Sequence, residues 1–438
     1  MLLYFTISNF RSIKESQTLS FEATSDSRLE DYFVVKKDKY RILKMATVLG
    51  ANASGKSNVL KAFQLFPQLI FSPCENKTDK IKYSRFKLCP ECQQADSTLE
   101  IGFVCHEKKY DYKLRFNESS VNFEELRCTP FGELRSHKVF ERTTDMELAL
   151  SRVTLGDKYG QSSSSFKEMN VNLIQNRTVF GAYQKSNVRI DWMKEIIDWI
   201  EDYFMPVITP MTDLSDFTTK LIDDGKIGKA QISDMIQNAD VGISDVVLKK
   251  TKENIPDNVV KRILESKVVS EELKKHIKED PTTDAIEVNL AHRAETGNIL
   301  FEFDEESLGT KRYYGLAGVM LLLANENHFL CVDELESSMH PDLYEHFIVT
   351  YLTNAKESQL VFTTHMREFL ADNDLFRDDS IWITEKSATG ATELYSIADY
   401  GTDVLRKGTN RLNAYKTGKL GGIPHTGDTS ILKFEKES

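Results

Sequence analysis

The chain has 438 residues, with 56 lysines and arginines against 67 aspartates and glutamates, so its formal net charge is −11. With 40% apolar and 28% charged residues it can bury a core, which excludes an intrinsically disordered chain. The length corresponds to roughly three domain-sized units. A net acidic chain has no overall field that attracts nucleic acid, so DNA binding would need a local basic patch.

No secretory leader is visible in residues 1–10, and the most apolar run, residues 315–324, is far shorter than the ~20 residues of a membrane helix. The six cysteines are spread thinly along the chain, which is typical of a reduced protein rather than a disulfide scaffold. We therefore expect a cytoplasmic protein without a membrane partner.

The N-terminal segments alternate between strand and helix patterns. Residues 2–7 and 18–23 are rich in aromatic and β-branched residues, and residues 45–49 form a short apolar run, which predicts three strands. Residues 56–66 carry apolar side chains at helical spacing and predict a helix. The loop that joins the last strand to this helix begins and ends with glycine.

This loop, Gly50–Ser57, fits the phosphate-loop pattern G-x-x-x-x-G-K-S/T in full. Gly55 lets backbone N–H groups approach phosphate oxygens, and the helix that follows directs its positive end at the same phosphates. Lys56 would bind the β- and γ-phosphates, and Ser57 would offer its hydroxyl to Mg²⁺. The residues expected to bind the nucleotide are Gly50, Asn52, Ala53, Ser54, Gly55, Lys56, Ser57 and Asn58.

The middle of the chain changes character twice. Residues 98–139 contain several short alternating segments, which predict an antiparallel sheet beside the first strands. Residues 191–204, 231–238 and 259–278 have helical spacing, and Asp191 could cap the first of these helices. The charges of the last segment are well mixed, which favours a solvated face over a surface for nucleic acid or a partner.

From residue 298 strands and helices alternate again. Strands are predicted over residues 299–303, 329–332 and 359–363, with helices over residues 313–324 and 341–352. Short apolar strands joined by helices are typical of a mainly parallel sheet covered on both faces. The two ends of the chain therefore look like parts of one α/β nucleotide-binding fold, with a helical insertion between them.

The apolar segment 329–332 runs into two acids, Asp333 and Glu334. In P-loop enzymes an acid at this place holds Mg²⁺, here Asp333 through water. Glu334 would then polarise the water that attacks the γ-phosphate.

With these motifs the chain resembles the ABC-type ATPase heads of the structural-maintenance-of-chromosomes, recombination-protein and DNA-repair group. More closely, it resembles stand-alone bacterial AAA-type ATPases related to the overcoming-lysogenisation-defect (OLD) family. The further segments that carry this resemblance are Ile7–Ile13, Glu306–Arg312, Asp333–Pro341, Gln359–His365 and Tyr415–Pro424.

The resemblance implies an ABC-type head that binds ATP and Mg²⁺. In such heads ATP lies between two subunits, so Ser307 and Gly309 of the signature segment would face the γ-phosphate held by a second copy. Arg11 would reach the nucleotide, and His365 would contact the γ-phosphate and sense hydrolysis. The implied domains are an N-terminal part of the head with an antiparallel β subdomain (1–185), a helical insertion (186–290) and a C-terminal part of the head (291–438).

The implied function is an ATPase that assembles as a homodimer or higher oligomer with shared ATP sites. Its ATP-driven change would control a separately encoded effector, a nuclease or a toxin, in bacterial anti-phage defence by abortive infection. About 70 residues follow His365, so we expect no nuclease domain of the OLD type within them. A DNA-repair ATPase that binds nucleic acid directly and a slowly hydrolysing ATP-gated scaffold stay open as alternatives.

Overall fold

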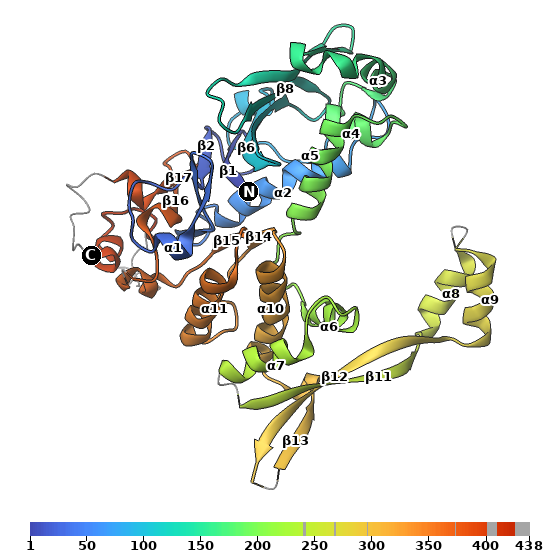
Figure 1. The fold of residues 1–438 in the computed structure, drawn as a ribbon, viewed down its shortest axis with the longest axis vertical. Coiled ribbons are helices and arrows are strands. Elements are labelled where there is room, and N and C mark those ends of the chain that lie inside the picture. Colours follow the sequence, from blue (N-terminus) through green and yellow to red (C-terminus); the bar gives the residue numbers. More distant parts are fainter. Residues whose placement is uncertain (240–241, 267–268, 296, 373, 401–409, 425–438) are drawn as a thin grey trace, which may run out of the picture. The chain divides into compact units, whose positions relative to one another are not determined.

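The computed structural model describes residues 1–239, 242–266, 269–295, 297–372, 374–400 and 410–424. The chain forms two compact units (Figure 1). The first unit comprises Met1–Pro210, Glu326–Ser337 and Leu352–Ser438, and the second comprises Met211–Asn325 and Ser338–Tyr351. Within the described residues, no helix combines the length and hydropathy needed to cross a bilayer.

A five-stranded sheet forms the centre of the first unit. Its order is β14 (Phe329–Val332), β15 (Gln359–Thr363), β5 (Met45–Gly50), β16 (Ile381–Lys386) and β17 (Thr392–Ser396). The first four strands run parallel, and β17 is antiparallel to β16. Every residue of β14, β15 and β5 is buried, which explains their continuous apolar sequences.

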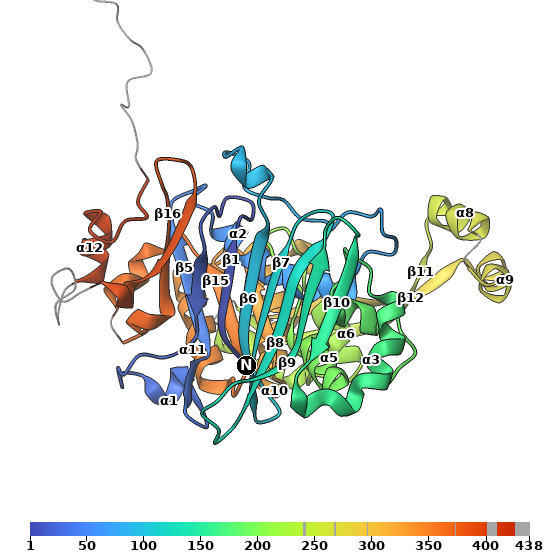
Figure 2. The ribbon, with the colours of Figure 1, turned by 90° about the horizontal axis from the view of Figure 1, so that it is seen from above.

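The second sheet of this unit is antiparallel and seven-stranded (Figure 2). Its order is β10 (Leu150–Leu155), β9 (His137–Asp145), β8 (Val121–Pro130), β7 (Lys108–Phe116), β6 (Ser97–Cys105), β1 (Leu2–Ser8) and β2 (Gln17–Ser20). Helix α2 (Lys56–Phe71) contacts both sheets, because the ring of Phe63 lies 4.5 Å from that of Phe5 in β1 and 5.0 Å from that of Phe329 in β14. The α/β head with an antiparallel β subdomain that the sequence predicts is therefore confirmed.

The shorter elements of the first unit surround these sheets. They are α1 (Glu30–Phe33), β3 (Val34–Lys37), β4 (Tyr40–Leu43), α3 (Ser163–Met169), α4 (Val179–Gln184), α5 (Asp191–Tyr203) and α12 (Arg411–Lys416). Asp191 lies in the first turn of α5 and does not cap it, because the N-cap residue is Ile190. Its carboxylate can still interact favourably with the helix dipole.

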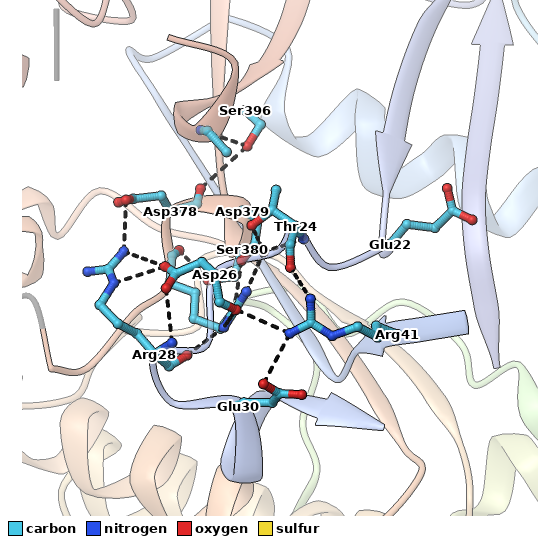
Figure 3. A network of polar contacts seen from close by, with 12 residues as sticks. Glu22, Thr24, Asp26, Arg28, Glu30, Arg41, Asp378, Asp379, Ser380 and Ser396 are labelled. Atoms are coloured by element: carbon cyan, nitrogen blue, oxygen red, sulfur yellow. Dashed lines mark hydrogen bonds and ion pairs between the residues drawn. The ribbon is translucent and has the colours of Figure 1, made fainter. Parts of the chain in front are cut away.

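A polar network anchors the start of β16 (Figure 3). The guanidinium of Arg377 is fully buried and donates to both carboxylate oxygens of Asp379 at 2.9 and 2.6 Å. The second oxygen of Asp379 also accepts from the backbone N–H and the hydroxyl of Thr24, and Arg28 pairs with Asp26 and Asp378. These contacts tie the N-terminal loop to the turn that precedes β16 and so fix the strand beside the phosphate loop.

The second unit is built on a separate core. Helices α6 (Ser215–Asp223), α7 (Lys229–Asn238) and α10 (Leu308–Asn325) pack with a three-stranded sheet. The sheet order is β11 (Ile243–Asn254), β12 (Thr282–Ala294) and β13 (Gly297–Glu302). Helices α8 (Asp257–Glu265) and α9 (Glu271–Glu279) lie at the end of the β11–β12 pair, and most of α11 (Pro341–Asn354) belongs to this unit (Figure 1).

The helical character expected for residues 186–290 is wrong in part. Strand β11 lies inside this range and β12 begins inside it, and the helix expected over 259–278 is divided into α8 and α9. The two strands pair from Ile243–His292 to Asn254–Thr282, so their hydrogen-bond partners are 28 or more residues apart. A local periodicity does not report such a pairing, whereas it does report helices. The three domain ranges expected from the sequence stay a prediction.

Candidate nucleotide-binding site

The phosphate loop has a backbone that two glycines make possible. Gly55 adopts φ +115°, and a Cβ atom there would lie 2.1 Å from the hydroxyl oxygen of Thr392. A Cβ atom at Gly50 would lie 2.4 Å from the carbonyl oxygen of Thr384. The loop that joins β5 to α2 therefore packs closely against β16 and β17, and its glycines leave its backbone free to approach an anion.

Hydroxyl groups from β16, β17 and the N-terminal loop frame this turn. Ser54 Oγ lies 2.6 Å from Thr384 Oγ1, and Thr392 Oγ1 lies 2.7 Å from the carbonyl oxygen of Ser54. Ser12 Oγ lies 2.8 Å from Thr392 Oγ1 and accepts from the Asn58 amide at 2.7 Å. Ser12, Thr384 and Thr392 are missing from the predicted site. Only Ser12 has a sequence signal, because it follows Arg11 in the predicted opening motif.

Arg11 lies at the edge of this frame. Its backbone adopts φ 51° and donates to the carbonyl oxygen of Ser84 at 2.8 Å. The guanidinium carbon lies 5.6 Å from the centre of the Phe10 ring, and the residue is exposed. Its contact with a nucleotide stays a prediction.

Lys56 is only 6% exposed, and its ammonium group donates to the carbonyl oxygens of Gly50 at 2.8 Å and Ala51 at 3.2 Å. Burial lowers the pKa of Lys56, while the carboxylates of Glu334, Asp333 and Glu336 act in the opposite direction. A buried ammonium group at the base of a phosphate loop supplies a positive charge to an anion bound there.

The acids that follow β14 lie against the end of β15. Thr363 Oγ1 donates to Asp333 Oδ1 at 2.6 Å and accepts from the backbone N–H of Glu334 at 2.8 Å. The Glu334 carboxylate lies 3.6 Å from His365 Nε2, and both side chains are roughly half exposed. Strands β5, β14 and β15 are parallel, so their carboxyl ends meet at one edge of the sheet. This edge brings Lys56, Asp333, Glu334 and His365 together.

A cavity of about 680 Å³ adjoins the phosphate loop. Its walls come from residues 49–52, from the segment after β15 and from the end of β16. The C-terminal segment closes it with Tyr415 and Gly422–Pro424. The Tyr415 hydroxyl donates to the Gly422 carbonyl at 2.9 Å, and Gly421 (φ 63°) has no room for a Cβ atom beside the Tyr395 hydroxyl. Part of the C-terminal segment Tyr415–Pro424, on which the resemblance partly rests, thus lies at the site.

The signature residues lie in the second unit. Ser307 caps the start of α10, because its hydroxyl accepts from the backbone N–H of Thr310 at 3.1 Å. Gly309 lies under the chain at Ser338, whose carbonyl oxygen would be 2.7 Å from a Cβ atom. Leu308 between them is 74% exposed. This helix start presents backbone N–H groups that could bind an anion.

The residues of the first unit fit ATP with Mg²⁺. Among the described residues no three His, Cys, Asp or Glu side chains are placed to hold a metal ion by themselves. Mg²⁺ is usually held by one or two carboxylates, waters and substrate phosphates, which Asp333 and the Ser57 hydroxyl could complete here. The carboxylates of Asp333, Glu334 and Glu336 all interact electrostatically with Lys56. One lysine does not neutralise three carboxylates, and a divalent cation would balance the remaining negative charge.

Comparison with known proteins identifies the family of the chain. A family model described as "AAA domain, putative AbiEii toxin, Type IV TA system" matches residues 45–371. No curated protein matches the chain.

Among solved structures, the chain is similar to the head domain of a structural-maintenance-of-chromosomes (SMC) protein from Thermotoga maritima. The TM-score is 0.39 and the sequence identity is 10%, and the match covers 90% of this chain and 98% of that one. An SMC head bound to the C-terminal winged-helix domain of ScpA has a TM-score of 0.37 and 14% identity over 90% and 97% of the two chains. The assignment rests on the family model, which covers most of the chain and includes the phosphate loop, Asp333, Glu334 and His365. The protein therefore belongs to this family of AAA-domain ATPases.

Proposed function

We propose that the protein hydrolyses ATP with Mg²⁺, and that ATP-driven dimerisation or a conformational change controls a separately encoded effector in bacterial anti-phage defence. The observation that carries the hydrolytic part is the meeting of buried Lys56 with Asp333, Glu334 and His365 at one edge of the parallel sheet.

Each of these residues has a role that its surroundings support. Lys56 and the loop N–H groups would stabilise charge on the β- and γ-phosphates. Asp333 and Ser57 would hold Mg²⁺, which supplies charge neutralisation at the phosphates when bound. Glu334, half exposed and beside His365, can accept a proton or hydrogen bond from a water that enters from solvent.

The signature segment supports a shared ATP site. Ser307 and Gly309 stand at the start of α10, an 18-residue helix whose N–H groups could bind the γ-phosphate held by a second copy. A ligand held by two copies stabilises their dimer by mass action, so ATP would promote assembly. The exposed Leu308 would then be covered by the second copy.

A role in a defence system of the toxin–antitoxin kind is supported by the family description, which names a putative AbiEii toxin of a type IV system. A nuclease or toxin encoded beside this chain would be the partner whose activity the ATP-driven change controls.

Direct DNA binding by a repair ATPase is less well supported. The lysines of β11 carry acidic partners, with Lys249–Glu287 at 3.3 Å and Lys252–Asp280 at 3.3 Å. DNA binding predicts ATPase activity that is stimulated by DNA and an affinity that falls steeply with salt. A slowly hydrolysing scaffold would instead assemble with ATP and show almost no turnover.

The decisive experiment compares two variants with the wild-type protein. Lys56→Ala should abolish tight ATP binding, and an unchanged affinity would contradict the site. Glu334→Gln should bind ATP, accumulate as a dimer in sedimentation and lose turnover by the roughly 10²–10⁴-fold typical of a lost general base. Turnover within about tenfold of wild type would rule out Glu334 as that base. Adding duplex DNA to the same assays tests the DNA-binding alternative.

A further inference from the structure

Glu336 lies in the motif segment Asp333–Pro341, in which only Asp333 and Glu334 have proposed roles. It follows the two catalytic acids in the loop after β14, and its Oε1 accepts a hydrogen bond from the backbone N–H of His365 at 2.6 Å. The backbone N–H of Leu335 donates to the carbonyl oxygen of Thr363 at 3.1 Å in the same loop. The acidic loop and the histidine segment are therefore one hydrogen-bonded structure.

The second carboxylate oxygen of Glu336 has different surroundings. Oε2 is buried and has no hydrogen-bond partner among the described residues. Burying a carboxylate oxygen without a hydrogen-bond donor costs free energy, so this atom is a candidate to accept a hydrogen bond from a bound ligand or water. The Glu336 carboxylate acts electrostatically on Lys56, which places it within reach of the phosphate loop.

We propose that Glu336 is a positioning residue whose two oxygens have separate tasks. Oε1 holds the backbone of the switch residue His365. Oε2 accepts hydrogen bonds from the water shell of the Mg²⁺ ion that Asp333 and Ser57 hold. Mg²⁺ keeps several of its waters when it binds, and carboxylates that orient such waters tune the affinity for the metal. This inference rests on the proposed ATPase site and deepens it.

Two substitutions separate the two tasks. Glu336→Gln keeps an oxygen that can accept from the His365 N–H, but it replaces Oε2 by an amide group that donates. Glu336→Ala removes both oxygens. The exposed Glu345 of α11 provides the matched control Glu345→Gln, which changes the net charge by the same amount.

The readout is the affinity for a fluorescent ATP analogue, measured with excess Mg²⁺ and with EDTA, together with steady-state turnover. In Glu336→Gln we expect the affinity in EDTA to be kept and the gain in affinity on adding Mg²⁺ to fall about tenfold, as for other groups that orient a metal's ligands. In Glu336→Ala we expect the same loss, plus turnover at least about tenfold below that of Glu336→Gln, because His365 is no longer held. Glu345→Gln should match the wild type.

The outcomes distinguish the inference from the function on which it rests. A wild-type protein that binds no analogue would overturn the proposed function and this inference with it. If the wild type binds and Glu336→Gln shows an unchanged Mg²⁺ effect, the task of Oε2 is refuted alone. Equal turnover in the Gln and Ala variants would refute the task of Oε1. Because Glu336→Gln preserves volume and the acceptor, it keeps the test decisive should the Ala variant fail to fold.

Discussion

Replacing Thr363 by valine tests whether β15 holds the acids Asp333 and Glu334 in place. The Thr363 side chain is fully buried, and its hydroxyl bridges the Asp333 carboxylate at 2.6 Å and the Glu334 N–H at 2.8 Å. Valine has nearly the same shape but cannot make either contact. The substitution therefore removes the bridge without opening a large cavity.

The expected loss of stability follows from these two contacts. A hydrogen bond to a charged group contributes about 1.5–3 kcal/mol, and a bond between neutral groups about 0.5–1.5 kcal/mol. Because Asp333 is only partly buried, water can replace part of its lost contact, so we expect the free energy of unfolding to fall by about 2 kcal/mol. Turnover should fall about 10–100-fold, the usual effect of losing a group that orients a metal ligand.

Urea unfolding and steady-state ATP hydrolysis measure the two effects, and Thr47 in β5 provides a matched control. Thr47 is also fully buried, but its hydroxyl has no hydrogen-bond partner among the described residues. Thr47→Val should thus keep or increase the stability and leave ATP binding intact. Equal losses in the two variants, or full turnover in Thr363→Val, would refute the bridging role of Thr363.

Three further predictions concern the loop, a buried ion pair and a buried lysine. Gly55→Ala should weaken ATP binding at least about tenfold in a nucleotide titration, because the new Cβ atom would clash with Thr392. Gly132 also has a positive φ but lies in open space, so the control variant Gly132→Ala should bind ATP as the wild type does. Arg142→Met leaves the fully buried carboxylate of Glu124 without its cationic partner. The free energy of unfolding in urea should therefore fall by about 3–5 kcal/mol, and a fall of less than about 1 kcal/mol would contradict the buried ion pair. Burial lowers the pKa of Lys44 from 10.5 to about 8. Below pH 8 the folded protein must hold Lys44 in its charged form, which lowers the free energy of unfolding, and this loss becomes smaller as the pH rises toward 10.5. The stability of wild type relative to Lys44→Met should therefore rise by about 2–3 kcal/mol between pH 7 and pH 10.5 in urea unfolding, and a flat difference would contradict the lowered pKa.

The strands and helices near the nucleotide site could be predicted from local sequence. Residues 45–49, 329–332 and 359–363 are short apolar runs, and the structure has β5, β14 and β15 at these places. The helix after the phosphate loop also matches, although it extends to Phe71. These elements are strongly patterned, because strands buried on both faces contain almost only apolar residues.

Other parts could not be predicted in this way. The pairing of β11 with β12 joins residues 28 or more positions apart, so a local periodicity does not report it. The alternation of Ile286, Val288 and Leu290 with polar residues is a strand signal that the helical expectation for residues 186–290 overlooked. Thr384 and Thr392 frame the phosphate loop from more than 300 residues away. Nothing in the sequence near them indicates this role, since it depends on β16 pairing with β5.

The motifs of the candidate site could be recognised from local sequence: a phosphate loop with Lys56 and Ser57, two acids after an apolar strand, and a histidine after another. These motifs are local because each must give one backbone turn or one strand end a defined set of side chains. The groups that hold these motifs in place can be seen only in the folded chain. Thr363 bridges the two acids, Glu336 binds the His365 backbone, and hydroxyls of β16 and β17 support the loop. Such contacts arise only when parallel strands from both ends of the chain meet at one edge, so the order of the strands in the sheet determines them.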